Sequence, residues 1–240
     1  VALAVAPRTS AAEPRRVLRA MLQIAETSFD PQFASDAASD AVIAEVYEAM
    51  LDYDYLARPV KLVPRTLEAL PTTSDGGRTW IARLKTGIRF TPDPAFGGKP
   101  RELVAADYAY TYRRILDPAV KSPWLWLFEG RIAGSDEARA AAAKTGRFDY
   151  DAPMAGLEVV DRYTLRIRLN APDLRFPYAL AIPNTGAVAR EAVEAYGRDF
   201  GAKPVGTGAF RLAEYKRSAR IVLERNPDYW DRGKPYLDRV

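Results

Sequence analysis

The sequence contains no cysteine and no histidine among its 240 residues. The lack of cysteine excludes disulfide bonds, thiolate catalysis and zinc sites built on cysteine. The lack of histidine removes the usual general base and the most common ligand of transition metals. A chain without cysteine can cross an oxidising space without mispairing, although this absence does not fix the compartment. Both absences narrow the chemistry that the chain can perform.

Long hydrophobic runs are also missing. Residues 1–6 are apolar but too few to span a bilayer, and no other segment is apolar enough for a membrane helix. Small and polar residues follow this stub, as they do at the end of a secretory signal whose basic start has been removed. Residues 1–14 are therefore expected to be either the remnant of a signal peptide or an N-terminal tail.

Clustered charge of one sign is lacking as well. The chain has 35 Lys+Arg against 31 Asp+Glu, and these charges are scattered along it. A face that binds nucleic acid usually needs clustered basic residues. We therefore interpret the basic excess as a general property of the surface, with nucleic acid kept only as a minor alternative.

What is present is an ordinary globular composition, with 48% hydrophobic and 11% aromatic residues. This is enough for one large domain or two small ones. Helix and strand patterns intermix along the chain without an internal repeat, so the expected class is α/β or α+β.

The first elements are predicted from apolar runs and turn residues. Residues 17–25 are expected to form a buried strand, followed by a turn at Ser28-Phe-Asp-Pro-Gln. Asp40 is the expected N-cap of a helix whose apolar face runs from Val42 to Leu51.

Later segments alternate between the two patterns. Strands are predicted at residues 79–85, 157–160, 164–169, 209–215 and 220–224, and another strand begins at residue 236. Helices are predicted at residues 108–116, 124–128, 136–144, 176–180 and 188–196.

Three short motifs have structural interpretations that outweigh chemical ones. Gly206-Thr-Gly lacks the spacing and the lysine of a phosphate-binding loop and precedes a strand, so tight backbone packing is its expected role. The acid pairs Asp52/Asp54 and Asp149/Asp151 lack the further ligands of a calcium loop and are expected to be solvated loop residues.

Trp124 and Trp126 follow Ser122-Pro123. Two residues apart, they cannot both face the same core, and one of them could line a cleft, where aromatic rings bind flexible ligands. From the residues alone, core packing of both is the favoured interpretation.

Several blocks together resemble a known family. Pro204-Val-Gly-Thr-Gly-Ala-Phe-Arg-Leu and Arg220-Ile-Val-Leu-Glu-Arg-Asn-Pro-Asp-Tyr-Trp-Asp resemble the signature of family 5 extracellular solute-binding proteins. These proteins are the oligopeptide- and dipeptide-binding components of ABC importers. The resemblance covers nearly everything after residue 14, in order. Its other blocks are Ser28-Phe-Asp-Pro, Val46-Tyr-Glu-Ala-Met-Leu, Pro64-Arg-Thr-Leu-Glu-Ala-Leu, residues 80–90 and residues 105–118.

The resemblance implies an α/β fold of the periplasmic-binding-protein type II class, in its large form with three lobes. Residues 15–46 and 171–240 would form the first lobe, and residues 47–170 the additional lobe that is characteristic of the family. The opposing lobe that closes on the ligand is expected to follow residue 240. The chain is thus expected to be an N-terminal fragment.

Ligand contacts are carried over only at matching positions. Ala34, Ser35, Asp36 and Ala37 resemble the stretch whose backbone pairs with a bound peptide as an added strand. Trp124 matches an aromatic residue that lines the pocket, and Thr207 and Gly208 match a turn that faces the cleft near the hinge. Ser35 stands where some peptide-binding relatives carry an acid.

The function that the resemblance implies is non-catalytic. The chain would belong to a periplasmic protein, free or membrane-associated, that captures an oligopeptide or similar solute for an inner-membrane ABC permease. No catalytic residue, cofactor, metal, nucleic acid or stable membrane insertion is expected. Two alternatives remain open: the same family with a sugar, an opine or a metal chelate as ligand, and a hydrolase that uses a pair of carboxylates.

Overall fold

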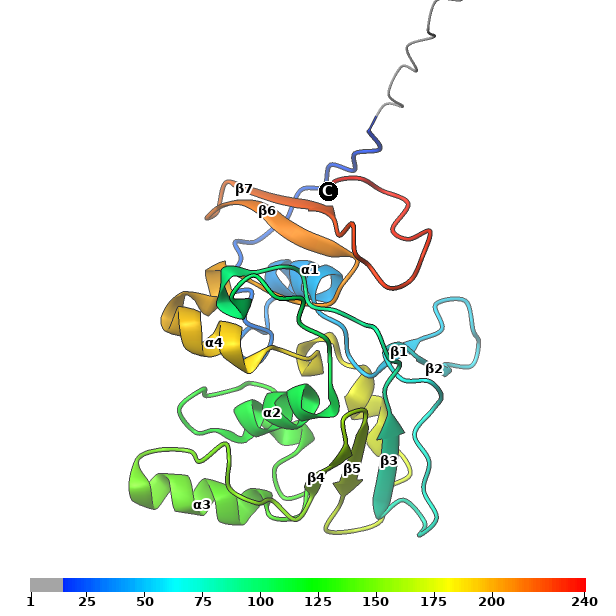
Figure 1. The fold of residues 1–240 in the computed structure, drawn as a ribbon, viewed down its shortest axis with the longest axis vertical. Coiled ribbons are helices and arrows are strands. Elements are labelled where there is room, and N and C mark those ends of the chain that lie inside the picture. Colours follow the sequence, from blue (N-terminus) through cyan, green and yellow to red (C-terminus); the bar gives the residue numbers. More distant parts are fainter. Residues whose placement is uncertain (1–14) are drawn as a thin grey trace, which may run out of the picture.

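The computed structural model describes residues 15–240, and the expected tail or signal remnant at residues 1–14 lies outside them (Figure 1). Helices and short antiparallel strands alternate along the described chain, with short 3-10 segments between them. The α-helices are α1 (Ala37–Val46), α2 (Ala105–Leu116), α3 (Ser135–Thr145) and α4 (Arg190–Tyr196). The strands are β1 (Leu51–Tyr53), β2 (Leu62–Pro64), β3 (Thr79–Arg83), β4 (Leu157–Asp161), β5 (Thr164–Arg168), β6 (Phe210–Lys216) and β7 (Arg220–Arg225).

The strands form three small antiparallel sheets. β1 pairs with β2, β5 lies between β3 and β4, and β6 pairs with β7. In Figure 1 the β6–β7 hairpin covers α1 at one end of the molecule, and the three-stranded sheet lies at the other end beside α2 and α3. Helix α1 contacts β6, and helix α2 contacts both β4 and β5.

The three-stranded sheet buries one face, as alternation in the sequence predicts. Trp80 lies opposite Ile167 and Ala82 lies opposite Leu165, and all four side chains are buried. Arg168 lies on the other face and is exposed. The predictions for residues 79–85, 157–160 and 164–169 are therefore confirmed.

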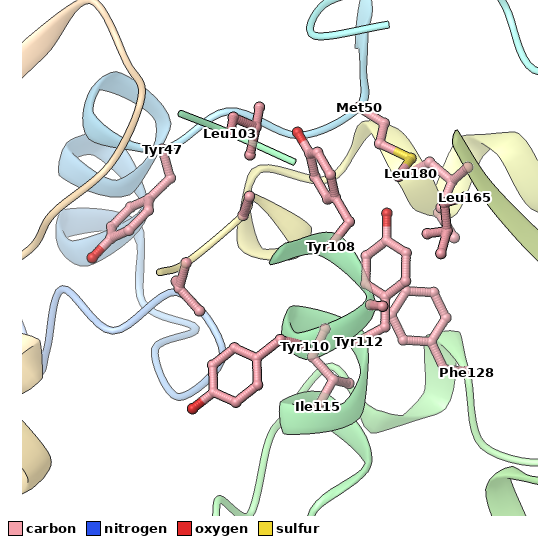
Figure 2. Close-up of a cluster of buried hydrophobic side chains, with 14 of the residues drawn as sticks. Tyr47, Met50, Leu103, Tyr108, Tyr110, Tyr112, Ile115, Phe128, Leu165 and Leu180 are labelled. Atoms are coloured by element: carbon pink, nitrogen blue, oxygen red, sulfur yellow. The ribbon is translucent and has the colours of Figure 1, made fainter. Parts of the chain in front are cut away.

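Aromatic side chains of α2 connect the two ends of the molecule. Tyr108 and Tyr112 are fully buried, and the ring centroid of Tyr112 lies 4.8 Å from that of Phe128. Figure 2 shows Tyr112 beside Phe128, on the same side as Leu165 of β5 and Leu180. The predicted stripe on this helix is confirmed, and the helix ends at Leu116 before Asp117-Pro118.

The buried strand predicted at residues 17–25 is wrong. Val17 forms one isolated bridge to Arg239, the Leu18 N–H bonds the Arg239 carbonyl, and Met21 is 89% exposed. Within residues 15–240 no sheet covers this segment, so its large apolar side chains are exposed. Hydrophobicity alone therefore predicts a burial that does not occur.

The helix predicted from Asp40 to Leu51 is also shifted. It begins at Ala37 with Asp36 as N-cap and ends at Val46. Tyr47 is already extended, and Leu51 enters β1. Tyr47, Met50 and Leu51 are buried although they follow the helix, so the apolar stripe in the sequence continues beyond the helix end.

Three further segments are less regular than predicted. The helices expected at residues 124–128 and 176–180 are 3-10 segments, Leu125–Leu127 and Phe176–Ala181. The strand expected from residue 236 is not regular, but Val240 exchanges two hydrogen bonds of 2.9 Å with Leu223 of β7. None of the helices within residues 15–240 has both the length and the apolar character needed to cross a membrane.

A buried ion pair joins the turn at residues 28–32 to α2. Arg114 donates to both carboxylate oxygens of Asp30, at 3.0 and 2.7 Å, and also to Gln32 Oε1. The two charged side chains are 7% and 14% exposed, so each depends on the other for neutralisation.

We predict that Arg114→Met lowers the free energy of unfolding by about 3–5 kcal/mol, because it leaves the Asp30 carboxylate without its buried partner. Urea denaturation followed by circular dichroism measures this loss. The control is Arg190→Met, which removes a half-exposed cation paired with Asp151 and should cost less than about 1 kcal/mol. Equal losses in the two variants would contradict the role assigned to burial.

Candidate ligand-binding site

The segment that leads into α1 is fixed by hydrogen bonds to the turn before it. The N–H groups of Phe33 and Ala34 both donate to the Asp30 carbonyl, at 3.1 and 3.0 Å. The Gln32 N–H donates to the Asp30 carboxylate at 3.1 Å. The predicted turn is therefore present, and it sets the direction in which the next residues leave.

The Ala34 carbonyl holds three distant segments together. It accepts a hydrogen bond of 2.8 Å from Trp124 Nε1 and one of 3.3 Å from Asn184 Nδ2. Asn184 Nδ2 also donates to Asp40 of α1 at 2.9 Å. The structure thus brings together two predicted site residues, Ala34 and Trp124, that lie 90 positions apart.

Ala34 itself has no backbone group left for a ligand. It is buried, its N–H bonds Asp30, and its carbonyl carries two donors. Within residues 15–240, however, neither the N–H nor the carbonyl of Ser35 has a hydrogen-bond partner, and Ser35 is exposed. The next residue, Asp36, has extended backbone with φ −97° and ψ 150°. The Asp36 carbonyl accepts from the Asp40 N–H at 2.9 Å, so the free backbone groups at this point are those of Ser35, which can pair with an added strand.

Asp36 has a structural role that its predicted position in the site did not reveal. Its carboxylate accepts from the Ser39 N–H at 2.8 Å, the Ser39 hydroxyl at 2.6 Å and the Thr27 hydroxyl at 2.5 Å. Burial alone would raise the pKa of Asp36, but these hydrogen bonds lower it from the ordinary value of 3.8 to about 2. Asp36 therefore caps α1 as an anion, and the exposed Ala37 begins the helix.

The two tryptophans have different environments. Trp124 is partly buried against the core, whereas Trp126 is 62% exposed. Core packing of both rings, which the residues alone favoured, is therefore wrong for Trp126. Both lie at a 3-10 turn, where side chains two residues apart point in different directions.

Thr207 and Gly208 lie at the opposite end of α1 from Ser35. The Gly208 N–H donates to the carbonyl of Val46, the last residue of the helix, at 2.9 Å. A helix of this length, 10 residues, spans about 15 Å. A Cβ on Gly208 would lie 2.3 Å from the Glu45 carbonyl oxygen, which confirms the expected close packing of the backbone. Their role as ligand contacts stays a prediction.

Next to Thr207 lies a buried carboxylate that receives four donors. Glu48 is 2% exposed. Its oxygens accept from Arg65 Nε at 2.9 Å, Thr207 Oγ1 at 3.0 Å, Tyr229 OH at 2.7 Å and Trp230 Nε1 at 2.8 Å. Burial and the charge of Glu48 raise the pKa of Tyr229, so its hydroxyl stays protonated and donates.

An open pocket of about 550 Å³ is lined in part by Tyr229 and Trp230, the two aromatic donors to Glu48. It is lined by Lys85, Asp228 and Arg232 among others, and the Lys85 ammonium lies 4.2 Å from the centre of the Trp230 ring. No residue of the predicted site lines this pocket. The pocket and the Ala34–Trp124 contact are therefore separate features.

The acid pairs have partners within the protein. Asp52 lies 3.5 Å from Arg65, and Asp54 accepts from the Leu56 N–H at 3.1 Å. Asp149 accepts from the Asp151 N–H at 3.0 Å, and Asp151 pairs with Arg190. Within residues 15–240 no group of three or more acidic side chains is placed to hold a metal ion.

Two functional candidates escaped the sequence analysis, Glu48 and Asn184. Asn184 is buried and joins Ala34 to Asp40, but nothing in its local sequence marks it. Glu48 did carry a signal, because it is an acid inside the otherwise apolar run of residues 46–51. A buried acid needs donors, and that requirement could have been stated in advance.

Comparison with known families agrees with this architecture. The model of the bacterial extracellular solute-binding proteins, family 5, matches residues 61–240. The chain belongs to this family. The matched range includes the blocks at residues 64–70, 105–118, 204–212 and 220–231. Arg65, Thr207, Tyr229 and Trp230, which donate to Glu48, lie in these blocks.

Individual relatives are more distant. The glutathione-binding protein GsiB of Salmonella choleraesuis is 28% identical over 214 residues, which are 89% of this chain and 35% of the relative. The Escherichia coli murein tripeptide binding protein MppA has a TM-score of 0.77 at 25% identity, with 95% of this chain and 42% of that one covered. OppA of Haemophilus influenzae, solved with the peptide RPPGFSPFR, has a TM-score of 0.74 at 23% identity and shares the fold, with 90% and 39% covered.

These likenesses confirm the predicted α/β fold of the large type II periplasmic-binding-protein class. The chain spans about a third of the length of the curated relatives it matches and about two-fifths of the solved structures.

We predict that the stabilising effect of Asp36 disappears in acid. The pKa of Asp36 is lower in the folded state than the ordinary 3.8, so the anion stabilises the fold above about pH 4 and loses this effect as the pH falls towards 2. In urea unfolding, the free energy of unfolding of wild type should exceed that of Asp36→Asn by about 1–2 kcal/mol at pH 7. At pH 3 this difference should be about half as large.

The control for Asp36 is Glu137→Gln, which changes an exposed acid in the first turn of α3. Its effect should stay within about 0.5 kcal/mol at both values of pH. A gap between wild type and Asp36→Asn that does not shrink in acid would refute the assignment of Asp36 as an ionised cap.

We also predict that Glu48→Gln destabilises the protein by about 3–5 kcal/mol, because an amide offers one acceptor oxygen to four donors and deprives Arg65 of its nearer and buried carboxylate partner. Thermal and urea unfolding measure the loss. Asp52→Asn touches the same Arg65 at an exposed position and should cost at most about 1 kcal/mol. If the two variants were equally stable, Glu48 would not be the centre of this cluster.

Proposed function

We propose that the chain is part of a periplasmic substrate-binding protein, which captures an oligopeptide or similar solute and delivers it to an inner-membrane ABC permease. The observation that carries the proposal is the exposed, unpaired backbone of Ser35 beside the Ala34–Trp124 contact, in a chain of family 5. Main-chain pairing gives affinity with little dependence on the ligand's side chains.

The ligand class is drawn from the relatives' names. GsiB is named for glutathione, MppA for a murein tripeptide, and OppA was solved with a peptide. All three ligands contain amide groups that can exchange hydrogen bonds with an extended backbone. A peptide-type ligand is therefore proposed ahead of a sugar, an opine or a metal chelate.

We propose no catalytic role. Asp52, Asp54, Asp149 and Asp151 bond backbone N–H groups or arginines, which is the behaviour of acids that stabilise loops. A carboxylate hydrolase would need two acids facing one substrate.

The proposed lobes follow the resemblance. Residues 15–46 and 171–240 would be the first lobe, and residues 47–170 the additional lobe. The Ala34–Trp124 bond and the Asp30–Arg114 pair connect the two, which supports a ligand surface built where these lobes meet. In the whole protein, a further lobe would close over this surface.

The test compares Ser35→Pro with Ser35→Ala in the whole protein, purified without refolding. Proline removes the Ser35 N–H and should lower affinity for a tripeptide such as trialanine about five- to tenfold in calorimetry, whereas alanine should leave it unchanged. Circular dichroism establishes that both variants fold.

Native mass spectrometry of the same preparation identifies what is bound. A series of masses spaced by amino-acid residues supports the peptide proposal. A single defined non-peptide mass would favour a sugar, an opine or a metal chelate as the ligand. Equal affinities of the two Ser35 variants in calorimetry would show that the Ser35 N–H does not contact the ligand.

A further inference from the structure

The loop between β1 and β2, residues 54–61, exposes an unusual amount of apolar surface. Tyr55, Leu56 and Val60 are 87%, 83% and 60% exposed. Tyr53 and Tyr178 lie at the base of the loop, with ring centroids 6.3 Å apart, and both are partly exposed. Figure 1 shows the loop projecting from the side of the molecule next to β1 and β2. Contiguous exposed apolar side chains of this kind mark an interaction surface.

The exposure does not come from a lack of local structure. The Asp54 N–H donates to the Lys61 carbonyl at 2.8 Å and closes the loop. Arg58 donates to the carbonyls of Ala57 and Tyr55, at 2.8 and 3.3 Å. The loop therefore satisfies much of its own backbone while its apolar side chains point outward, which is what entry into a medium of low polarity requires.

The acidic and basic side chains of the loop differ in their hydrogen-bond partners. The Asp52 and Asp54 carboxylates accept from backbone N–H groups, those of Tyr53 and Leu56. Lys61 is exposed, and its ammonium has no hydrogen-bond or ion-pair partner within residues 15–240. The exposed Arg58 adds a second cation beside Leu56 and Val60. The outer part of the loop thus offers aliphatic groups together with positive charge.

From this arrangement we propose that the β1–β2 loop docks on the surface of a bilayer that contains anionic phospholipid. Leu56 and Val60 enter the boundary between headgroups and acyl chains, and the tyrosines lie at headgroup level, where such rings are favoured. Arg58 and Lys61 contact phosphates, because long basic side chains can reach the headgroups from an apolar contact.

The charge of the surface favours an anionic bilayer as the partner. Within residues 15–240 neither Arg58 nor Lys61 pairs with a carboxylate, so both cations beside the apolar tip can contact lipid phosphates. A bilayer interface accepts a small apolar tip with basic flanks, and the contact is reversible. The inference does not depend on the ligand that the protein carries.

The test is cosedimentation of the protein with two kinds of vesicle, one of phosphatidylethanolamine with phosphatidylglycerol and one of phosphatidylcholine alone. Wild type should bind the first kind more strongly. Leu56→Ser combined with Val60→Ser should lower its partition about tenfold or more. Lys61→Gln should lower binding to the anionic vesicles about fivefold.

The matched control is Met21→Ser, which removes an equally exposed apolar side chain outside the loop and should bind as wild type does. Wild type that stays in solution with both vesicles, or a loop variant that binds unchanged, overturns the proposal. So does an equal loss in Met21→Ser. A dimer in sedimentation velocity that the loop variant abolishes would assign the surface to a second copy of the chain instead.

Discussion

The buried carboxylate of Glu48 is the contact on which the arrangement of this chain depends most. An anion below the surface costs several kcal/mol unless donors surround it. Arg65, Thr207, Tyr229 and Trp230 supply those donors from three separate parts of the sequence. The backbone carbonyl of the same residue accepts from Tyr108 of α2 as well. One residue thus fixes the β6–β7 end of the molecule relative to α2 and its sheet.

Much of this fold could be predicted from the sequence, and the failures have a common cause. Strands β3 and β5 and helix α2 were predictable because burial on one face imposes a period that the residues display. Residues 17–25 are equally apolar, but a run of apolar residues does not say what will cover it. Asp36 and Asp40 are both acceptable caps. Asp36 has a local donor in Ser39, but it also bonds Thr27, nine residues earlier, which only the folded turn brings close.

The candidate site, like the fold, could be predicted from the sequence only in part. Ala34 and Trp124 were found through the family resemblance, but the hydrogen bond between them is a tertiary fact that no periodicity encodes. Both backbone groups of Ala34 are already hydrogen-bonded. Its neighbour Ser35, whose N–H and carbonyl have no partner within residues 15–240, is therefore the better candidate for pairing with a ligand. Asn184 was missed altogether, since a buried amide looks like any other loop asparagine in sequence.

The separation of the Glu48 donors along the chain has a consequence for the order of folding during synthesis. Tyr229 and Trp230 follow Glu48 by 181 and 182 residues. At about 5–20 residues per second, a ribosome needs about 10–40 s to add them. Throughout that interval the nascent chain contains an acid that cannot be buried with its full set of donors. The native core around it must therefore assemble late, after the Asn-Pro-Asp-Tyr-Trp block has emerged.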